Sequence, residues 1–449
     1  MKRPSLLLIT SLLFTLAACG TPATTEAPTA VPTSAPTRTP RPTSRPTLAP
    51  EPSATPAPPT SAPTAPATDV PLAMMTAELS ATVVAGLPPT PTPDQANGAG
   101  GLGLEGVSAQ ALRSPDGWPQ LWAVASHGMS VGDPSQVHFV AIYTHAGGDW
   151  KQLDRFELTN DDYLDATGLA QVELDPKNIW LEAQGGAGAH SGCYDLLRFD
   201  GKQLHSEVSS CSSSPGDSRL EDVNGDGTPE VVLDATDYYV FCYACGVREI
   251  NYTVMRWDGQ QMVEVKLAQL PGSAPSKLRD LTNRAIGLAQ AGLWKDAQAT
   301  ISQTLLLQEY NQDAKLDAGL IGLVATARAQ QAQSGAYPLL DNLFYGDYPA
   351  VLDLMRTLKP DAQFSAETPL VKGATAEGWE QQVTDEITKT TDLALKLTPD
   401  LAAAYFLRGW GVHLTDPANP SVLADLERAA QLDPQEKLFS ESLAYLRKK

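Results

Sequence analysis

The residues best suited to bind a metal ion lie in the segment DVNGDGTPE, 222–230. Its oxygen-bearing residues are Asp222, Asn224, Asp226, Thr228 and Glu230. The side chains alternate along the segment, Thr228 can offer its carbonyl oxygen, and Glu230 adds a final carboxylate. A hard cation that takes six or more oxygen ligands requires such a spacing. The segment is therefore a predicted calcium loop, and the alternative is a solvated Asx-rich turn without metal.

The segment is not a complete EF-hand. Leu233 stands where the closing glutamate belongs, and the β-branched exit predicts a strand rather than a helix. It resembles instead the calcium loops of FG-GAP and VCBS repeats, which join strands in integrin-like β-propeller blades. That resemblance covers the loop, the following strand and the RWDG hairpin. It implies that the metal ligands include Asp222, Asn224, Asp226 and Glu230.

The first residues are those of an exported protein, because two basic residues precede an apolar run, 6–16, and small residues then lead to Cys19. The string LAAC, 16–19, resembles the lipobox of bacterial lipoproteins, in which the cysteine becomes the mature N-terminus and carries a diacylglycerol. This implies a signal peptide at 1–18 and a lipidated Cys19. The protein would then lie in the cell envelope, outside the cytoplasm and anchored to a membrane. The alternative is an ordinary secretory peptide with an incidental cysteine.

Four further cysteines are disulfide candidates, because exported proteins favour disulfides. They are Cys193, Cys211, Cys242 and Cys245. Four cysteines allow three pairings, and we favour Cys193 with Cys211 because the two flank one hairpin turn. Cys242 would then pair with Cys245. The alternative for this CxxC pair is a redox or zinc site, although no helix start follows it.

Two other binding or catalytic sites are conceivable in the same region. One alternative is an envelope hydrolase whose active site lies in the Gly-rich string GGAGAHSGC, 185–193. No base and nucleophile stand there at a suitable spacing, so no catalytic residue is assigned. Aromatic side chains that stack on sugars would make it a carbohydrate-binding adhesin. The candidates are Trp118, Trp122, Trp180 and Tyr194, although we favour positions in the core or on a sheet face for them.

An internal repeat predicts the elements around these residues. CYDLLRFDGKQL, 193–204, aligns with NYTVMRWDGQQM, 251–262, at an offset of 58 residues, and each predicts a hairpin with an Asp-Gly turn. A looser copy begins at Phe139, and a further short strand precedes each copy. We therefore expect three related antiparallel β units over 101–272, as a partial propeller or a small sandwich.

The composition changes at residue 273 to Ala, Leu and Gln at helical spacing. The strings at 402–414 and 421–434 predict two amphipathic helices joined by a polar loop. They resemble a tetratricopeptide repeat (TPR), and a second copy covers 283–308. The residues that carry the resemblance are Tyr405, Gly409, Val412, Leu426, Ala429 and Pro434. It implies an α-helical solenoid over 273–449 whose concave face binds a protein or peptide, and the alternative is a purely structural array.

Between the signal and the β units lies a segment that cannot form a core. Residues 20–69 hold 14 prolines in 50 positions and no aromatic residue. We expect a disordered, semi-rigid tether over 19–100, with a helical turn or two where 72–87 become more apolar.

The charge balance excludes one class of function. The chain has 32 basic and 52 acidic residues, a net charge of -20, which argues against binding to nucleic acid. The predicted β region, 101–272, carries 10 basic and 25 acidic residues of these. The sequence thus predicts a multidomain α+β lipoprotein, not an enzyme, that binds a protein partner through its helices and calcium through its β region.

Overall fold

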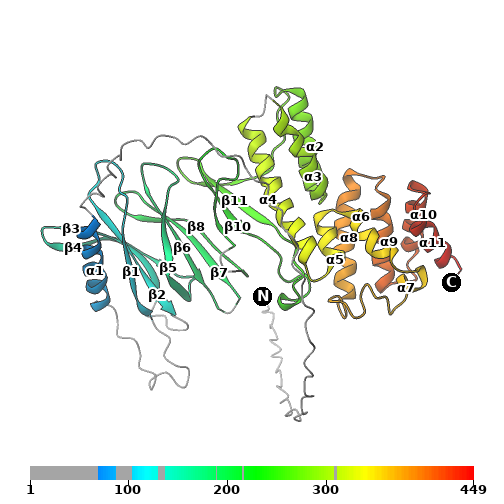
Figure 1. Ribbon diagram of the computed structural model, residues 1–449, viewed down its shortest axis with the longest axis horizontal. Coiled ribbons are helices and arrows are strands. Elements are labelled where there is room, and N and C mark those ends of the chain that lie inside the picture. The colour runs from blue at the N-terminus through cyan, green and yellow to red at the C-terminus, as the bar shows by residue number, and fades with distance from the viewer. Residues whose placement is uncertain are drawn as a thin grey trace, which may run out of the picture. The chain divides into compact units, whose positions relative to one another are not determined.

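The computed structural model describes residues 69–86, 104–129, 137–188, 190–214, 217–307 and 311–448 (Figure 1). All of them belong to one compact unit that extends from Pro66 to Lys449. The predicted signal peptide, the lipidation site Cys19 and most of the predicted tether lie outside the described residues.

Helix α1, Asp69–Ala85, lies within the segment predicted to be a disordered tether. Leu79 is fully buried, and Leu72, Met75 and Val83 pack with it against the first β-sheet. These four residues follow one another at intervals of three or four, so they share one face of the helix. The helical turn or two predicted for 72–87 is thus part of a helix of 17 residues, which gains its stability from the sheet that it covers.

The strands form three consecutive antiparallel meanders, which correspond to the three predicted β units. The first consists of β1 (Leu104–Ala111), β2 (Leu121–Met129), β3 (His138–Ala146) and β4 (Asp149–Leu158). The second consists of β5 (Tyr163–Val172), β6 (Ile179–Gly186), β7 (Gly192–Phe199) and β8 (Leu204–Ser212). The third consists of β9 (Arg219–Glu221), β10 (Glu230–Asp234), β11 (Tyr252–Trp257) and β12 (Met262–Val265). A short pairing of β2 with β5 joins the first two into an 8-stranded sheet, and the third is a separate 4-stranded sheet.

The meanders pack face to face. Successive residues of a strand point to opposite faces, and here both faces are buried. In β2, Leu121 packs against the second meander, whereas Trp122 packs under α1. In β6, Leu181 packs against the first meander, whereas Trp180 packs against the third. This double burial explains why the second strands have apolar runs rather than a clean alternation.

Helices cover the two outer faces of this series of sheets. Helix α1 covers the free face of the first meander. On the third meander, Val232 and Val254 pack against Leu320 of α4 (Gln312–Ser334). The apolar faces are thus removed from water without a ring of blades, and the described strands form an open series of sheets.

The helical region begins after β12 and consists of consecutive helices that pack on one another. Besides α4, they are α2 (Ser276–Gln290), α3 (Trp294–Ile301), α5 (Pro338–Tyr345), α6 (Tyr348–Arg356), α7 (Pro360–Gln363), α8 (Glu380–Leu397), α9 (Ala402–Thr415), α10 (Pro420–Leu432) and α11 (Lys437–Leu446). Gly409 permits the close contact of α9 with α10, since a Cβ there would lie 2.6 Å from Leu426 Cδ1. Arg408 of α9 binds both neighbouring helices, with Nη1 2.6 Å from Asp392 Oδ1 and Nη2 2.7 Å from Asp425 Oδ1.

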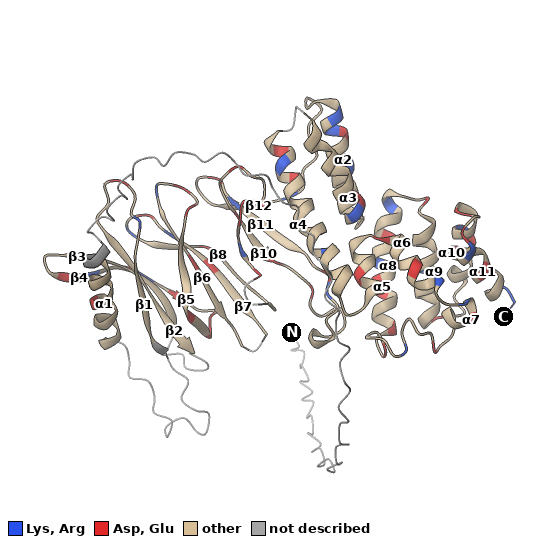
Figure 2. Cartoon of the chain, in the orientation of Figure 1, with Lys and Arg blue, Asp and Glu red and all other residues tan. Residues whose placement is uncertain are grey.

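The α+β architecture is therefore confirmed, with an antiparallel β region followed by a helical region. The predicted boundary at 272 falls between β12 and α2. Figure 2 shows Lys and Arg next to Asp and Glu on α2, α3 and α4. None of the helices in the described segments combines the length and the apolar character needed to cross a membrane.

Candidate functional sites

The predicted calcium loop connects β9 to β10 and folds around Asp222. The Asp222 carboxylate accepts hydrogen bonds from the amides of Gly225, Asp226 and Gly227, at 2.8, 3.0 and 2.9 Å. Asp226 in turn accepts the amide of Thr228 at 2.8 Å. This network of Asx turns fixes the backbone of the loop before β10 begins.

Two of the predicted ligands are buried beneath this turn. Asn224 is 6% exposed and Glu230 1% exposed, and Asn224 Nδ2 donates to Glu230 Oε1 at 2.9 Å. The amide of Val223 donates to Glu230 Oε2 at 3.0 Å. Burial raises the pKa of Glu230, and the negative charges of Asp226 and Asp222 raise it further. A cation at the loop would offset this repulsion.

Within the described part of the chain, no three His, Cys, Asp or Glu side chains are grouped so that they could hold a metal ion. The donor set of the loop nevertheless fits a hard cation in its chemistry. Its ligand candidates offer only oxygen, and three of them, Asp222, Asp226 and Glu230, are carboxylates.

Helix α4 lies directly against the loop. Gln312 Nε2 donates to Asn224 Oδ1 at 3.2 Å. A Cβ at Gly319 would lie 2.1 Å from the Val223 carbonyl oxygen, so only glycine permits this approach. The loop at 222–230 is therefore part of the contact between the β region and the helices.

The loop also borders a pocket that the equivalent loops of the other meanders share. The pocket has a volume of about 390 Å³. It is lined by Arg113, Ser114 and Pro115 after β1, by 171–176 and Asn178 around the end of β5, and by Gly227 and Thr228. The Asp175 carboxylate accepts a hydrogen bond from the amide of Lys177 at 2.7 Å, and the Asp226 carboxylate accepts the equivalent bond from the amide of Thr228. All three connections from first to second strand thus meet at one polar site.

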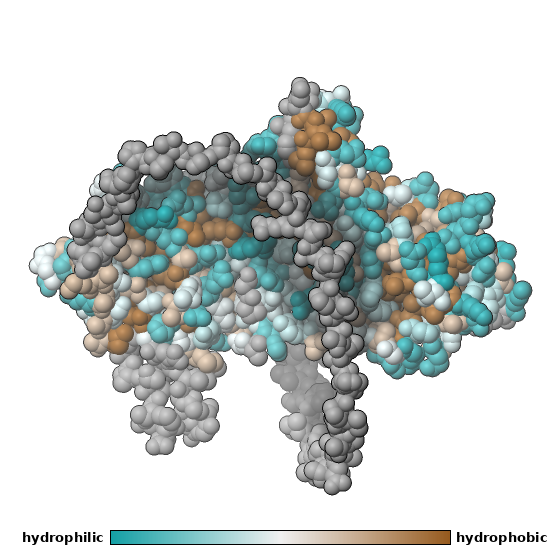
Figure 3. Space-filling view, in the orientation of Figure 1, coloured by the Kyte–Doolittle hydropathy of each residue, from teal (hydrophilic) through white to brown (hydrophobic). Residues whose placement is uncertain are grey.

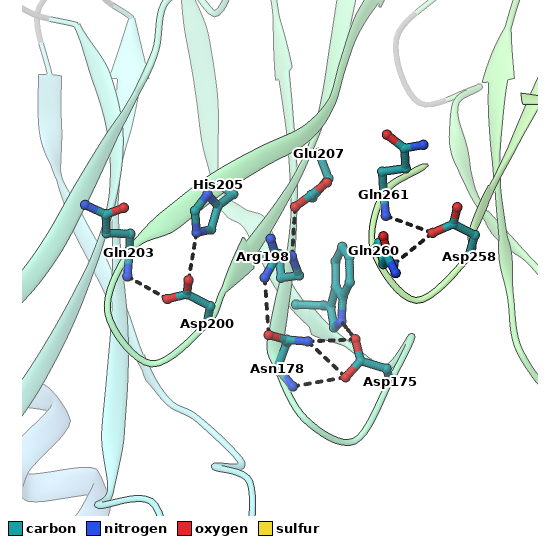
Figure 4. Close-up of polar contacts among 11 residues, drawn as sticks. Asp175, Asn178, Arg198, Asp200, Gln203, His205, Glu207, Asp258, Gln260 and Gln261 are labelled. Atoms are coloured by element: carbon teal, nitrogen blue, oxygen red, sulfur yellow. Dashed lines mark hydrogen bonds and ion pairs between the residues drawn. The ribbon is translucent and has the colours of Figure 1, made fainter. Parts of the chain in front are cut away.

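The hairpin turns of the second and third meanders have the same construction (Figure 4). In each, an aspartate, Asp200 or Asp258, accepts the amides two and three residues later at 2.8–2.9 Å. Next to the first turn, Arg198 Nε donates to Glu207 at 2.8 Å and its guanidinium lies over Trp257. Positions 58 residues apart thus have equivalent geometry, and Arg198 connects the two meanders.

The cysteines form two disulfides, Cys193–Cys211 and Cys242–Cys245. This is the pairing that the sequence favoured. The first joins directly opposed residues of β7 and β8. The second closes the short 3₁₀ helix η2, Tyr243–Cys245. Because the CxxC sulfurs are bonded to each other, they are not zinc ligands in this form.

The Gly-rich string lies at a cavity of about 680 Å³. Ser191 and Glu182 line the cavity. His190 stacks instead on Tyr243, with ring centroids 4.6 Å apart. The His190 ring is therefore turned toward the β10–β11 connection and away from Ser191 and Glu182 at the cavity.

Two buried aspartates near this string were not predicted. Asp161 is 5% exposed and Asp195 3% exposed. Burial raises the pKa of both, and the charge of Asp195 and a hydrogen bond with it help to raise that of Asp161 to about 8. Gly185 leaves room for the pair, since a Cβ there would lie 2.2 Å from Asp161 Oδ1. The sequence signal was an aspartate, Asp195, within the apolar and buried stretch of β7.

A second pair with catalytic residue types is structural. Ser126 Oγ lies 3.1 Å from His138 Nδ1, and both residues are fully buried. Ser126 Oγ also accepts the Phe139 amide at 3.0 Å. Burial lowers the pKa of His138. The pair therefore holds β2 to β3.

The aromatic residues considered for sugar binding are core residues. Trp122, Trp180 and Tyr194 are at most 2% exposed, and Trp118 packs edge-on against Phe199. Trp122, Trp180 and Tyr194 thus have the core positions that the sequence analysis favoured over sugar stacking. The sequence analysis missed a different aromatic group, around Tyr243, because its members come from separate loops.

The helical region contains an apolar pocket of about 560 Å³ between the ends of α8, α9, α10 and α11. Its lining includes Phe364, Val371, Leu414, Val422, Leu423 and Leu446, with Glu380 and His413 as polar members. Leu423 is 38% exposed. A second apolar surface lies after α3, where Leu306 is 86% exposed; Figure 3 shows brown surface near this end of the helices.

Comparison with known proteins returned no match to a protein-family model, to a curated protein or to a solved structure.

Proposed function

We propose that the protein is a lipid-anchored scaffold outside the cytoplasm whose helical region binds a protein partner. The observation that carries this proposal is the apolar pocket between α8 and α11. Exposed apolar surface within a concave site is typical of surfaces that bind a partner's apolar side chains. The sequence of α9 and α10 resembles a TPR, and TPR arrays bind peptides on their concave faces.

The chemistry of the pocket indicates the kind of segment it would accept. Leu423 and Val422 offer apolar contact, while Glu380 adds a negative charge. We therefore expect a partner segment with a large apolar side chain next to a basic one, which fits the acidic character of the whole chain.

The anchor and the disulfides support a position outside the cytoplasm. Disulfides persist in oxidising compartments, and a lipobox-like Cys19 would carry the acyl chains. Metabolic labelling with an alkyne fatty acid tests this part. The wild-type chain should take up the label and Cys19→Ser should not, whereas equal labelling of both would contradict the anchor.

Calcium is part of the proposal as a stabilising ligand of the loop at 222–230. Asp222, Asn224, Asp226, Glu230 and the Thr228 carbonyl would hold it. A ligand that binds only the native state stabilises by about 2.7 kcal/mol at one hundred times its Kd. Calcium should therefore raise the melting temperature of the wild type and of the turn variant Asp258→Ala, but not of Asp226→Ala. Unchanged melting of the wild type in chelator and in millimolar calcium would count against the loop.

The partner-binding proposal is tested with the full chain as bait in an envelope extract. Leu423→Glu places a charge in the pocket, and Leu393→Glu is the matched control because Leu393 is 39% exposed and lies outside the pocket. A specific partner should be retained by the wild type and by the control and lost with Leu423→Glu. Equal retention by all three would refute the pocket as the binding site.

A further inference from the structure

One cavity of the β region has no part in the proposed function. It measures about 680 Å³ and lies along β5, β6 and the Gly-rich connection that follows β6. A bulge builds one of its sides, because the pairing of β5 with β6 shifts register between Leu164 and Leu169. From this bulge, Asp165 and Thr167 contribute to the lining. Bulges redirect side chains, so the irregular part of β5 presents polar groups to the cavity.

The charged residues of the lining are both acidic. They are Asp165, which is exposed, and Glu182, which is half-buried. The described lining contains no Lys, Arg or His. Gln184 Nε2 donates to Glu182 Oε1 at 3.3 Å, but this amide is neutral and leaves the charge of the carboxylate uncompensated. The cavity is therefore complementary in charge to a cationic ligand.

A buried hydroxyl next to Glu182 lacks a hydrogen-bond partner. Tyr194 is 2% exposed, and its hydroxyl has no such partner among the described residues. Tyr194 lies directly opposite Gln184 in the pairing of β6 with β7, so both side chains leave the sheet on the face that also carries Glu182. Burial raises the pKa of Tyr194, and the negative charge of Glu182 raises it further. Native proteins rarely leave such a group unpaired, so a hydrogen-bonding ligand at Glu182 would account for it.

The remaining lining favours an organic cation over a metal ion. Tyr163, which is 43% exposed, pairs with Met129 across the joint of β5 and β2, and both side chains line the cavity. A tyrosine ring attracts an ammonium group, and apolar side chains pack against methylene groups. Among the described residues no three acidic, His or Cys side chains are grouped to hold a metal. The two carboxylates come from neighbouring strands, which matches two positive charges joined by an apolar chain.

We propose that this cavity binds an aliphatic diamine or polyamine, whose ammonium groups pair with Glu182 and Asp165 and whose methylene chain packs on Tyr163. The ammonium group at Glu182 would also donate a hydrogen bond to the Tyr194 hydroxyl oxygen. The surplus of acidic residues in the β region attracts such cations toward the site. The site does not depend on partner binding by the helices.

Isothermal titration of the full chain with putrescine, cadaverine and spermidine tests the proposal. We expect at least one of them to bind, and Glu182→Gln to weaken this binding at least about tenfold, because a charge-assisted hydrogen bond is lost. Tyr194→Phe should weaken it by a smaller factor, since the ring stays in the core and only the hydroxyl is removed. Glu157→Gln is the matched control and should bind as the wild type does, because Glu157 is an exposed glutamate of β4 outside the cavity.

Asp165→Asn keeps the test valid if Glu182→Gln does not fold, because Asp165 is exposed. It should also weaken the binding, and butylamine, which has one ammonium group, should bind more weakly than putrescine. Three results would overturn the proposal: no binding of any of the three amines, an equal loss of affinity in Glu157→Gln, or displacement of the amines by magnesium at equal concentration, which would indicate unspecific attraction of cations.

Discussion

Replacing Asp161 by asparagine should stabilise the protein, and increasingly so as the pH rises. Asp161 and Asp195 are buried side by side, and the pKa of Asp161 is raised to about 8 from 3.8. A carboxyl whose pKa is raised on folding is favourable in its protonated form. Its contribution is therefore complete below pH 3.8 and is lost as the pH rises to about 8. Asparagine has the same shape, stays neutral and can donate to Asp195.

The magnitude follows from the pKa. Between pH 5 and pH 8 the wild type should lose about 4 kcal/mol of its free energy of unfolding through Asp161, since each pH unit in this interval costs about 1.36 kcal/mol. This is an upper limit, because Asp195 stays buried in the variant and keeps part of the cost. We expect the advantage of Asp161→Asn over the wild type to grow by about 2–4 kcal/mol over this interval.

Urea titrations followed by tryptophan fluorescence, at several pH values from 5 to 8, measure the free energies of unfolding. Asp165→Asn is the matched control, because Asp165 is an exposed aspartate on the neighbouring strand β5. For this control, the free energy of unfolding should depend on pH as it does in the wild type. If Asp161→Asn also showed the pH dependence of the wild type, the two aspartates would not share a buried, proton-dependent contact, and the reasoning would be refuted.

Three further substitutions test contacts of the fold. Gly319→Ala should push α4 away from the loop at 222–230, because its Cβ would lie 2.1 Å from the Val223 oxygen; we expect a loss of about 1–3 kcal/mol in the free energy of unfolding, measured by thermal unfolding. Leu79→Ala should weaken the docking of α1 by about 2–4 kcal/mol, because Leu79 is fully buried. The amides of α1 should then exchange hydrogen faster, and unchanged exchange would mean that the sheet does not hold α1. Arg408→Ala leaves Asp425 buried without its partner and should cost about 2–4 kcal/mol, whereas a cost under about 0.5 kcal/mol would contradict the bridge.

The local features of the fold could be predicted because their causes are local. The Asp-Gly turns at Asp200 and Asp258 are made by hydrogen bonds within four residues. Cys193 and Cys211 flank one such turn, so the register of a single hairpin brings them together. Gly409 marks a close contact between helices that are neighbours in sequence.

The features that were missed depend on contacts between distant segments. Helix α1 follows a proline-rich stretch and becomes stable on a sheet face whose burial no local pattern shows. Asp161, which precedes β5, meets Asp195 of β7 across the intervening strand β6. The His190 ring contacts that of Tyr243, which belongs to another meander. For each, the residue types were visible in the sequence, but the partner was set by how distant strands and loops pack.

The most direct test of the scaffold proposal is site-specific photo-cross-linking in cells that express the full chain. A photoreactive residue at position 423 should give one discrete adduct with a protein partner, and the same residue at position 393 should give none. The same adduct bands at both positions would contradict the claim that the helical region binds a protein through its apolar pocket. The absence of an adduct at position 423 would contradict it as well.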